Sequence, residues 1–307
     1  MTAPGERATA RGRWRPVALG LYAGAFVVAS MVGGLPAGRD WLILWVLGAL
    51  VLVSVGQAQG AGKLLRDFLP LVAVLTAYDV LKGRTDTIAG HVYTLPQIRA
   101  DELLFGGTVP TVTLQRWFYT PRSPHVWDYF LVLVYLSYFF VPLVTAALLW
   151  KFRHQWYGSY ALTLVILAVM ALVTYAAFPA TPPWLAGVQH HIPHVYRVIH
   201  GLAGKVHVRL GRAFGSRSDF VNPVAAVPSL HFAVTTAFVL FFWPLTSRWR
   251  PLLVAYLFAM GLALVYLGEH YVFDLLIGGL YAVVAYAAAR AITRRRASGG
   301  MRRAGAH

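Results

Sequence analysis

The stretch YLGEHYVFDLLIGG, from Tyr266 to Gly279, joins two apolar runs near the end of the chain. Three ionisable residues interrupt it: Glu269, His270 and Asp274. An earlier stretch, NPVAAVPSLHFAV, from Asn222 to Val234, places His231 at the start of another apolar run. Ionisable residues in a membrane are costly, and most of those found there serve a function. The two stretches therefore predict membrane-crossing helices whose ends carry candidate functional groups.

The composition supports a membrane protein. The chain has 307 residues, of which 58% are hydrophobic and only 12% are charged, with a mean hydropathy of +0.59. A soluble domain would carry far more charge, so we expect a polytopic membrane protein. The chain has no cysteine, which excludes a disulfide framework and a thiolate metal site. No small-residue cleavage site follows the first apolar segment, so we expect that segment to be a span rather than a signal peptide.

The charge is strongly basic but is not arranged as a nucleic-acid-binding face. The net charge is +16, from 27 Lys and Arg against 11 Asp and Glu. The basic residues are concentrated in the two tails and in short loops. Anionic lipid headgroups and the orientation of the spans explain this distribution. We therefore expect membrane lipids as partners, and no nucleic acid.

Apolar segments of the length needed to cross a bilayer recur along the chain, and they predict an all-α helical bundle. We predict eight of them: 16–34, 41–56, 67–81, 127–150, 157–178, 229–247, 251–269 and 273–292. The second and third are short. They are also compatible with a re-entrant pair, which would leave six spans in place of eight.

Basic residues orient the predicted spans. The tails 1–15 and 293–307 are both rich in arginine, which predicts that both are cytoplasmic. The short basic loops agree with the same topology. The long segments 82–126 and 179–228 then lie outside the cytoplasm, and the first resembles an amphipathic interfacial segment with a Gly-Gly turn. This orientation brings the candidate groups to one extracytoplasmic face: His231, His270 and Asp274.

The spacing of these residues is suited to catalysis. His270 and Asp274 are four residues apart, which places them on one face of a helix. A carboxylate that accepts a hydrogen bond from one imidazole nitrogen leaves the other as a nucleophile or base. His231 supplies a second imidazole, suited to general acid work. Ser229, at a predicted helix N-terminus, offers a hydroxyl near unpaired amides that can bind phosphate.

Other interpretations of the same residues are available. A single interfacial histidine is often only solvated, and a His–Asp pair is often only structural. Two His and one Asp also make a plausible zinc set. A proton-coupled transporter with gate histidines is a further alternative, but its ionisable groups should lie deep within the spans rather than at their ends.

Other polar residues have simpler expected roles. The segment QHHIPH carries three histidines that could suggest a metal site, although a solvated loop is the better interpretation: His190, His191 and His194. Glu269 either raises the basicity of its neighbour His270 or faces water. Asp128 is expected to cap the helix that begins beside it.

Two motifs resemble a known family. PSLH (Pro228–His231), followed by HYVFD (His270–Asp274), resembles the second and third signatures of the PAP2 superfamily of lipid phosphatases and phosphotransferases. The leucine in PSLH and the pattern YLxxHYxxDxxxG resemble the inositol phosphorylceramide synthase branch. FPATPPW (Phe178–Trp184) is similar to that branch's proline-rich segment, and DELLFGGTVPTVTLQ (Asp101–Gln115) resembles bacterial members. The resemblance covers roughly residues 80–290.

The resemblance implies a mechanism. His270 would be the nucleophile that forms a phosphohistidine, and Asp274 would orient it. His231 would protonate the leaving oxygen and then act as the base toward the acceptor. No metal or other cofactor is implied. The substrate would be a phospholipid or a lipid phosphate, with water as acceptor in a phosphatase and an alcohol in a phosphotransferase.

One part of the family pattern is altered. The phosphatase branch has a Lys, six residues, then Arg-Pro ahead of PSxH. Here Lys205 and Arg212 have that separation, but Ala213 replaces the proline. The cation that holds the phosphate is therefore expected among Lys205, Arg209, Arg212 and Arg217, together with Ser229.

The expected organisation follows from these features. We predict an N-terminal tail over 1–15, N-terminal transmembrane helices over 16–81 and an interfacial segment over 82–126. A PAP2-like catalytic core over 127–292 and a C-terminal tail over 293–307 complete it. The protein is expected in the cell membrane, with its active site on the extracytoplasmic face.

Overall fold

The structure, a computed structural model, describes residues 60–82, 91–203 and 223–304, together with a few positions between 17 and 48. Within these ranges the chain is almost entirely helical and forms no β-strand. The all-α prediction is confirmed for this part of the chain. Eleven positions of the predicted segment 16–34 are described and all are helical, whereas the predicted segment 41–56 has only two described positions.

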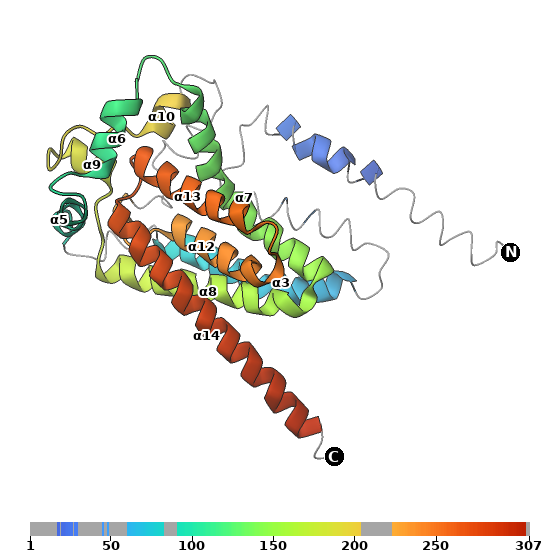
Figure 1. Cartoon of the computed structure of the whole chain (residues 1–307). Helices are drawn as coiled ribbons and strands as arrows, with labels where there is room; N and C mark the ends of the chain where they lie inside the picture. Colours follow the sequence, from blue (N-terminus) through green and yellow to red (C-terminus); the bar gives the residue numbers. More distant parts are fainter. Residues whose placement is uncertain are drawn as a thin grey trace.

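Six helices form the main bundle (Figure 1). They are α3 (Gly60–Lys82), α7 (Val126–Phe152), α8 (His154–Ala177), α12 (Leu230–Phe242), α13 (Arg250–Tyr266) and α14 (Val272–Ala304). Helices α12, α13 and α14 bring the two histidine-bearing segments together. The far end of α14 projects beyond the rest of the bundle (Figure 1).

Three helical stretches among the described residues are long and apolar enough to cross a membrane: Val126–Phe152, His154–Ala177 and Val272–Arg296. They correspond to the predicted segments 127–150, 157–178 and 273–292. The predicted segments 229–247 and 251–269 form apolar helices that are shorter, Leu230–Leu245 and Arg250–Tyr266. The predicted segment 67–81 is only part of α3, whose first turns carry charged residues that an apolar pattern does not detect.

Local chemistry sets several helix ends. Helix α8 ends at Ala177, directly before the proline-rich segment, because Pro179 cannot donate a backbone hydrogen bond. Helix α7 begins at Val126, and the backbone N–H of His125 donates to Asp128 Oδ2 at 2.7 Å. The predicted cap by Asp128 is therefore confirmed. The hydroxyl of Tyr266, at the end of α13, donates to the other carboxylate oxygen of Asp128.

Hydrogen bonds between side chains on different helices join the bundle. The indole N–H of Trp150 on α7 donates to Asp67 Oδ2 on α3 at 2.8 Å. The hydroxyls of Ser137 and Tyr256 link α7 to α13 at 2.7 Å. Those of Thr174 and Tyr281 link α8 to α14 at 2.8 Å. Such bonds help to hold helices together in lipid, where the surroundings of the bundle are as apolar as its side chains.

Four short helices gather at one end of the bundle (Figure 1). They are α5 (Leu95–Leu104), α6 (Pro110–Phe118), α9 (Pro183–Val188) and α10 (Val198–Ala203), and we call them the cap. Gly106 and Gly107, with φ of +64° and +85°, form the turn that joins α5 to α6. Since α7, α12 and α14 begin at this end and α8 and α13 finish there, the cap covers the N-terminal ends of α12, which carries His231, and of α14, which His270 precedes.

Three extended segments meet beside the cap. Tyr93, Ala180 and Ala225 form two parallel bridges. The backbone N–H of Tyr93 donates to the carbonyl of Pro179 at 2.8 Å, and that of Ala180 donates to the carbonyl of Val224 at 2.6 Å. The start of α5, the end of α8 and the approach to α12 are thereby tied together.

The basic loops lie at the other end of the bundle. Lys151 and Arg153 stand where α7 meets α8, and Arg248 and Arg250 stand where α12 meets α13. Helix directions place both junctions opposite the cap. The fold thus separates the basic loops from the candidate site along the bundle, which is the arrangement that the predicted orientation requires.

Candidate functional site

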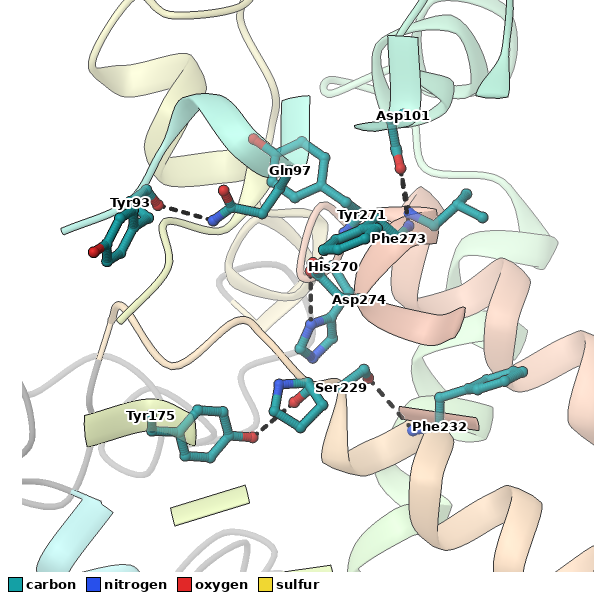
Figure 2. Close-up of polar contacts among 12 residues, drawn as sticks. Tyr93, Gln97, Asp101, Tyr175, Ser229, Phe232, His270, Tyr271, Phe273 and Asp274 are labelled. Atoms are coloured by element: carbon teal, nitrogen blue, oxygen red, sulfur yellow. Dashed lines mark hydrogen bonds and ion pairs between the residues drawn. The ribbon is translucent and has the colours of Figure 1, made fainter. Parts of the chain in front are cut away.

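His270 and Asp274 meet at the start of α14. His270 lies in the turn between α13 and α14, where its backbone N–H donates to the carbonyl of Leu264 at 3.1 Å. Its Nδ1 lies 3.3 Å from Asp274 Oδ2, and both side chains are buried, with residue exposures of 7% and 0%. The same carboxylate oxygen accepts the backbone N–H of Tyr271 at 2.9 Å. Figure 2 shows this pair at the first turn of α14.

The hydrogen bond assigns roles to the two ring nitrogens of His270. An ionised carboxylate only accepts, so the shared hydrogen belongs to Nδ1. In the neutral ring the lone pair is then on Nε2. The second nitrogen is therefore the one that can attack an electrophile or accept a proton.

His231 lies beside His270. It is in the first turn of α12, and the centroids of the two imidazole rings are 5.9 Å apart. The His231 ring packs on the rings of Tyr135 and Tyr138 from α7, at centroid distances of 4.6 and 4.0 Å. The fold thus brings together the three residues that the sequence predicts at one face. The rings of Tyr135 and Tyr138 set the orientation of His231.

Ser229 is the N-cap of α12. Its Oγ accepts the backbone N–H of Phe232 at 3.4 Å, and its own backbone N–H donates to the carbonyl of Asp274 at 3.0 Å. A Cβ added at Gly278 would collide with the Ser229 carbonyl. The starts of α12 and α14 are therefore in direct backbone contact, and glycine at position 278 permits that contact.

The cations predicted to hold a phosphate lie outside the described residues: Lys205, Arg209, Arg212 and Arg217. Sequence reasoning missed another one, Arg197. Its guanidinium forms a bidentate ion pair with Glu269, with Nε to Oε1 at 2.7 Å and Nη2 to Oε2 at 3.2 Å. The same guanidinium lies over the Trp184 ring, 4.7 Å from its centroid. Glu269 is thus an ion-pair partner, and a fixed positive charge lies one residue away from His270.

Two polar residues of the cap reach the turn that carries His270. The carboxylate of Asp101, on α5, is fully buried and accepts the backbone N–H groups of Val272 and Phe273, at 3.1 and 2.9 Å. Burial raises the pKa of Asp101 to about 6, although these two hydrogen bonds act in the opposite direction. Figure 2 shows Asp101 at the start of α14.

Gln115, on α6, makes three hydrogen bonds. Its amide nitrogen donates to the carbonyls of Tyr196 and Tyr266 at 2.9 and 2.8 Å, and its oxygen accepts the N–H of Tyr196 at 2.8 Å. Asp101 and Gln115 stand at the two ends of the stretch DELLFGGTVPTVTLQ. That stretch carries a family resemblance, but nothing in its pattern shows that its two ends contact the segment around His270.

The histidines of QHHIPH lie apart from the site. His190, His191 and His194 are exposed in the loop after α9, as expected for solvated residues. Among the described residues, no three His, Asp or Glu side chains are grouped closely enough to hold a metal ion. His231 and His270 lie at helix ends rather than in the middle of spans, which is not the placement expected of a proton-coupled transporter.

Comparison with known proteins places these residues in a family. A family model described as the PAP2 superfamily matches residues 107–288, which is more than half of the chain. The match includes His231, His270 and Asp274. A search of curated proteins found no match, and a search of solved structures found none either.

Proposed function

The chain belongs to the PAP2 superfamily, and on this premise we propose that it transfers the phosphoryl group or phospho-headgroup of a lipid through a phosphohistidine at His270. Members of this superfamily are generally phosphatases or phosphotransferases, and membership indicates activity on lipid-like substrates. The observation that carries the proposal is the buried His270–Asp274 pair, with the second imidazole of His231 5.9 Å away.

In the first half of the reaction, Nε2 of His270 attacks the phosphorus atom with its lone pair. The bond from phosphorus to the leaving oxygen breaks, and His231 donates a proton to that oxygen. The attacking imidazole gains positive charge as the phosphorus–nitrogen bond forms. Asp274 stabilises that charge through its contact with Nδ1 and holds the ring in place.

In the second half, an acceptor hydroxyl attacks the phosphohistidine. His231, now neutral, removes the acceptor proton, and the phosphorus–nitrogen bond returns its electrons to Nε2. Water as acceptor gives a phosphatase, and an alcohol gives a phosphotransferase. The leucine in PSLH favours a transferase related to inositol phosphorylceramide synthases.

A lipid substrate fits the surroundings of His231. An apolar pocket lies between α3, α7, α8 and α12, and its lining includes Leu164, Leu230 and Val234. Tyr138, which packs on His231, also lines it. An apolar surface therefore lies close to the His231 imidazole, which is compatible with a lipid substrate. The orientation by basic loops supports an extracytoplasmic site that draws its lipid from the outer leaflet.

Phosphoryl transfer also requires positive charge around the non-bridging oxygens. We assign this role to the loop before α12, through Lys205, Arg212 and Arg217 with Arg209, and to Ser229 at the helix N-terminus. Arg197 is tied to Glu269 and His200 through its three nitrogen atoms. Because Glu269 offsets its charge, we do not assign Arg197 the role of the phosphate-binding cation.

Turnover by purified variants tests the proposal. The full chain in vesicles that contain a lipid phosphate, such as phosphatidic acid, should release or transfer its phosphate. His270→Gln should abolish this activity, because an amide cannot form the covalent intermediate. The matched control is His194→Gln, in an exposed cap loop, which should retain full activity. More than a few per cent of wild-type activity in His270→Gln would refute the role assigned to His270.

A further inference from the structure

We propose that Asp101 is a positioning residue for phosphoryl transfer: from the cap, it binds the first amides of α14 and so keeps the Asp274 carboxylate on His270. The inference rests on the proposed function for its catalytic consequence. Its structural part concerns the start of α14 alone and can be tested separately.

The start of α14 needs a partner from elsewhere in the chain. The first N–H groups of a helix have no partner within that helix, and a Ser, Thr, Asp or Asn side chain usually binds them. The residue before Val272 is Tyr271, whose hydroxyl is at the far end of a ring and cannot fold back to its own helix start. Asp101 fills the role instead, from α5.

Two carboxylates accept the first three backbone N–H groups of this turn between them. Asp274 accepts the N–H of Tyr271, and Asp101 accepts those of Val272 and Phe273. Asp101 is fully buried and the two hydrogen bonds are partly buried, so an amide left without a partner there would be destabilising. Without Asp101, the N–H groups of Val272 and Phe273 would lose their acceptors. The turn that holds Asp274 against His270 would then be less firmly fixed.

Asp101 is itself well anchored. The hydroxyl of Thr94, directly before α5, lies 2.8 Å from that of Thr181. The Tyr93–Ala180–Ala225 bridges continue from there to the approach of α12. One connected set of contacts therefore runs from the start of α12, through the beginning of α5, to the start of α14. Asp101 completes this set, which ties the start of α12 to the start of α14.

The charges around Asp101 agree with this role. A carboxylate at a helix N-terminus is stabilised by the helix dipole as well as by the two hydrogen bonds. The neighbouring charge of Asp274 acts in the opposite direction on the pKa of Asp101. Two carboxylates held close together in a buried turn repel each other, and this repulsion lowers the stability of the fold. Their proximity is understandable if the turn must present one of them, Asp274, to His270.

The test compares three variants of the full-length protein. Asp101→Ala removes both acceptors, whereas Asp101→Asn keeps one. Glu102→Gln is the matched control, since it neutralises the neighbouring carboxylate, which has no assigned contact with α14. Hydrogen exchange is measured on a peptide that contains Val272 and Phe273, and kcat and KM are measured on phosphatidic acid vesicles.

We expect Asp101→Ala to accelerate exchange in that peptide but not in peptides from α8. It should lower kcat by about 10- to 100-fold, the usual effect of a displaced catalytic group, with KM changed less than about twofold. Asp101→Asn should lose less activity than Asp101→Ala, and Glu102→Gln should match the wild type in hydrogen exchange and in kcat. The acid limb of the kcat/KM profile should move to lower pH in Asp101→Ala, because His270 would have lost its carboxylate partner.

Three results would overturn the proposal. They are unchanged exchange in the Val272–Phe273 peptide of Asp101→Ala, accelerated exchange with unchanged kcat, and equal losses in Asp101→Ala and Glu102→Gln. Failure of the proposed function would look different. In that case His270→Gln would keep its turnover, while the exchange result for Asp101 would stand.

Discussion

Replacing Asp274 by Asn tests how much the His270–Asp274 contact contributes to catalysis. The substitution keeps the size of the side chain and one oxygen for the N–H of Tyr271, but it removes the negative charge that lies 3.3 Å from Nδ1. If that oxygen stays with Tyr271, it also stays beside Nδ1, because one carboxylate oxygen takes part in both contacts. The ring then keeps a neutral acceptor but loses the negative charge that would stabilise it as it becomes cationic.

The distance between Asp274 and Nδ1 of His270 sets the size of the expected loss of activity. Opposite unit charges 3.3 Å apart attract by about 5 kcal/mol at an effective dielectric of 20. The imidazole carries only part of a full charge in the transition state, so about half of this energy should be lost. A loss of about 2.5 kcal/mol corresponds to a decrease in kcat of about 70-fold.

Single-turnover kinetics on phosphatidic acid vesicles provide the assay. They separate formation of the phosphoenzyme from release of product. Asp67→Asn is the matched control, because that carboxylate contacts Trp150 at the other end of the bundle. A phosphorylation rate in Asp274→Asn within about threefold of the wild type would refute the assigned role of Asp274.

The remaining predictions concern packing, sidedness and metal. Gly278→Ala should destabilise the protein by about 1–3 kcal/mol in thermal unfolding and should reduce activity. Gly158→Ala, with open space around it, should change neither stability nor activity. Equal effects of the two substitutions would contradict the close contact of α12 and α14. The chain has no native cysteine, so an impermeant maleimide should label His194→Cys in intact cells and Ser247→Cys only after permeabilisation. The opposite labelling pattern would show that the predicted topology is inverted. Exhaustive chelation should leave turnover unchanged, and loss of activity with recovery on zinc addition would establish a metal requirement.

Sequence patterns predict the parts of the structure that depend on local chemistry. The apolar segments 127–150 and 157–178 become long helices within about three residues of the predicted bounds, because burial in lipid and proline both act locally. The motif spacing and the orientation rule together bring His231 to His270. The start of α3 lies outside the predicted segment, because its first turns carry Lys63 and Arg66, which an apolar pattern does not detect.

The cap could not be predicted from the same patterns. Asp101, Gln115 and Arg197 each contact the turn around His270, but each comes from a different segment of the chain. Their partners are backbone groups or a single side chain far away in sequence. Hydrophobic periodicity gives no information about such contacts. Glu269 is buried and paired with Arg197, but the sequence alone does not show that burial and so does not indicate the pair.

The central claim is a covalent intermediate on His270, and the most direct measurement is to trap it. The wild-type protein is quenched in base within one turnover of phosphatidic acid labelled in its phosphate, digested, and its phosphopeptides are sequenced by mass spectrometry. We predict an acid-labile, base-stable phosphate on the peptide that contains His270. It should be absent in His270→Gln and should accumulate in His231→Gln if an activated leaving group bypasses the need for an acid. Turnover in the wild type with no label on His270, or with the label on another residue, would contradict the mechanism.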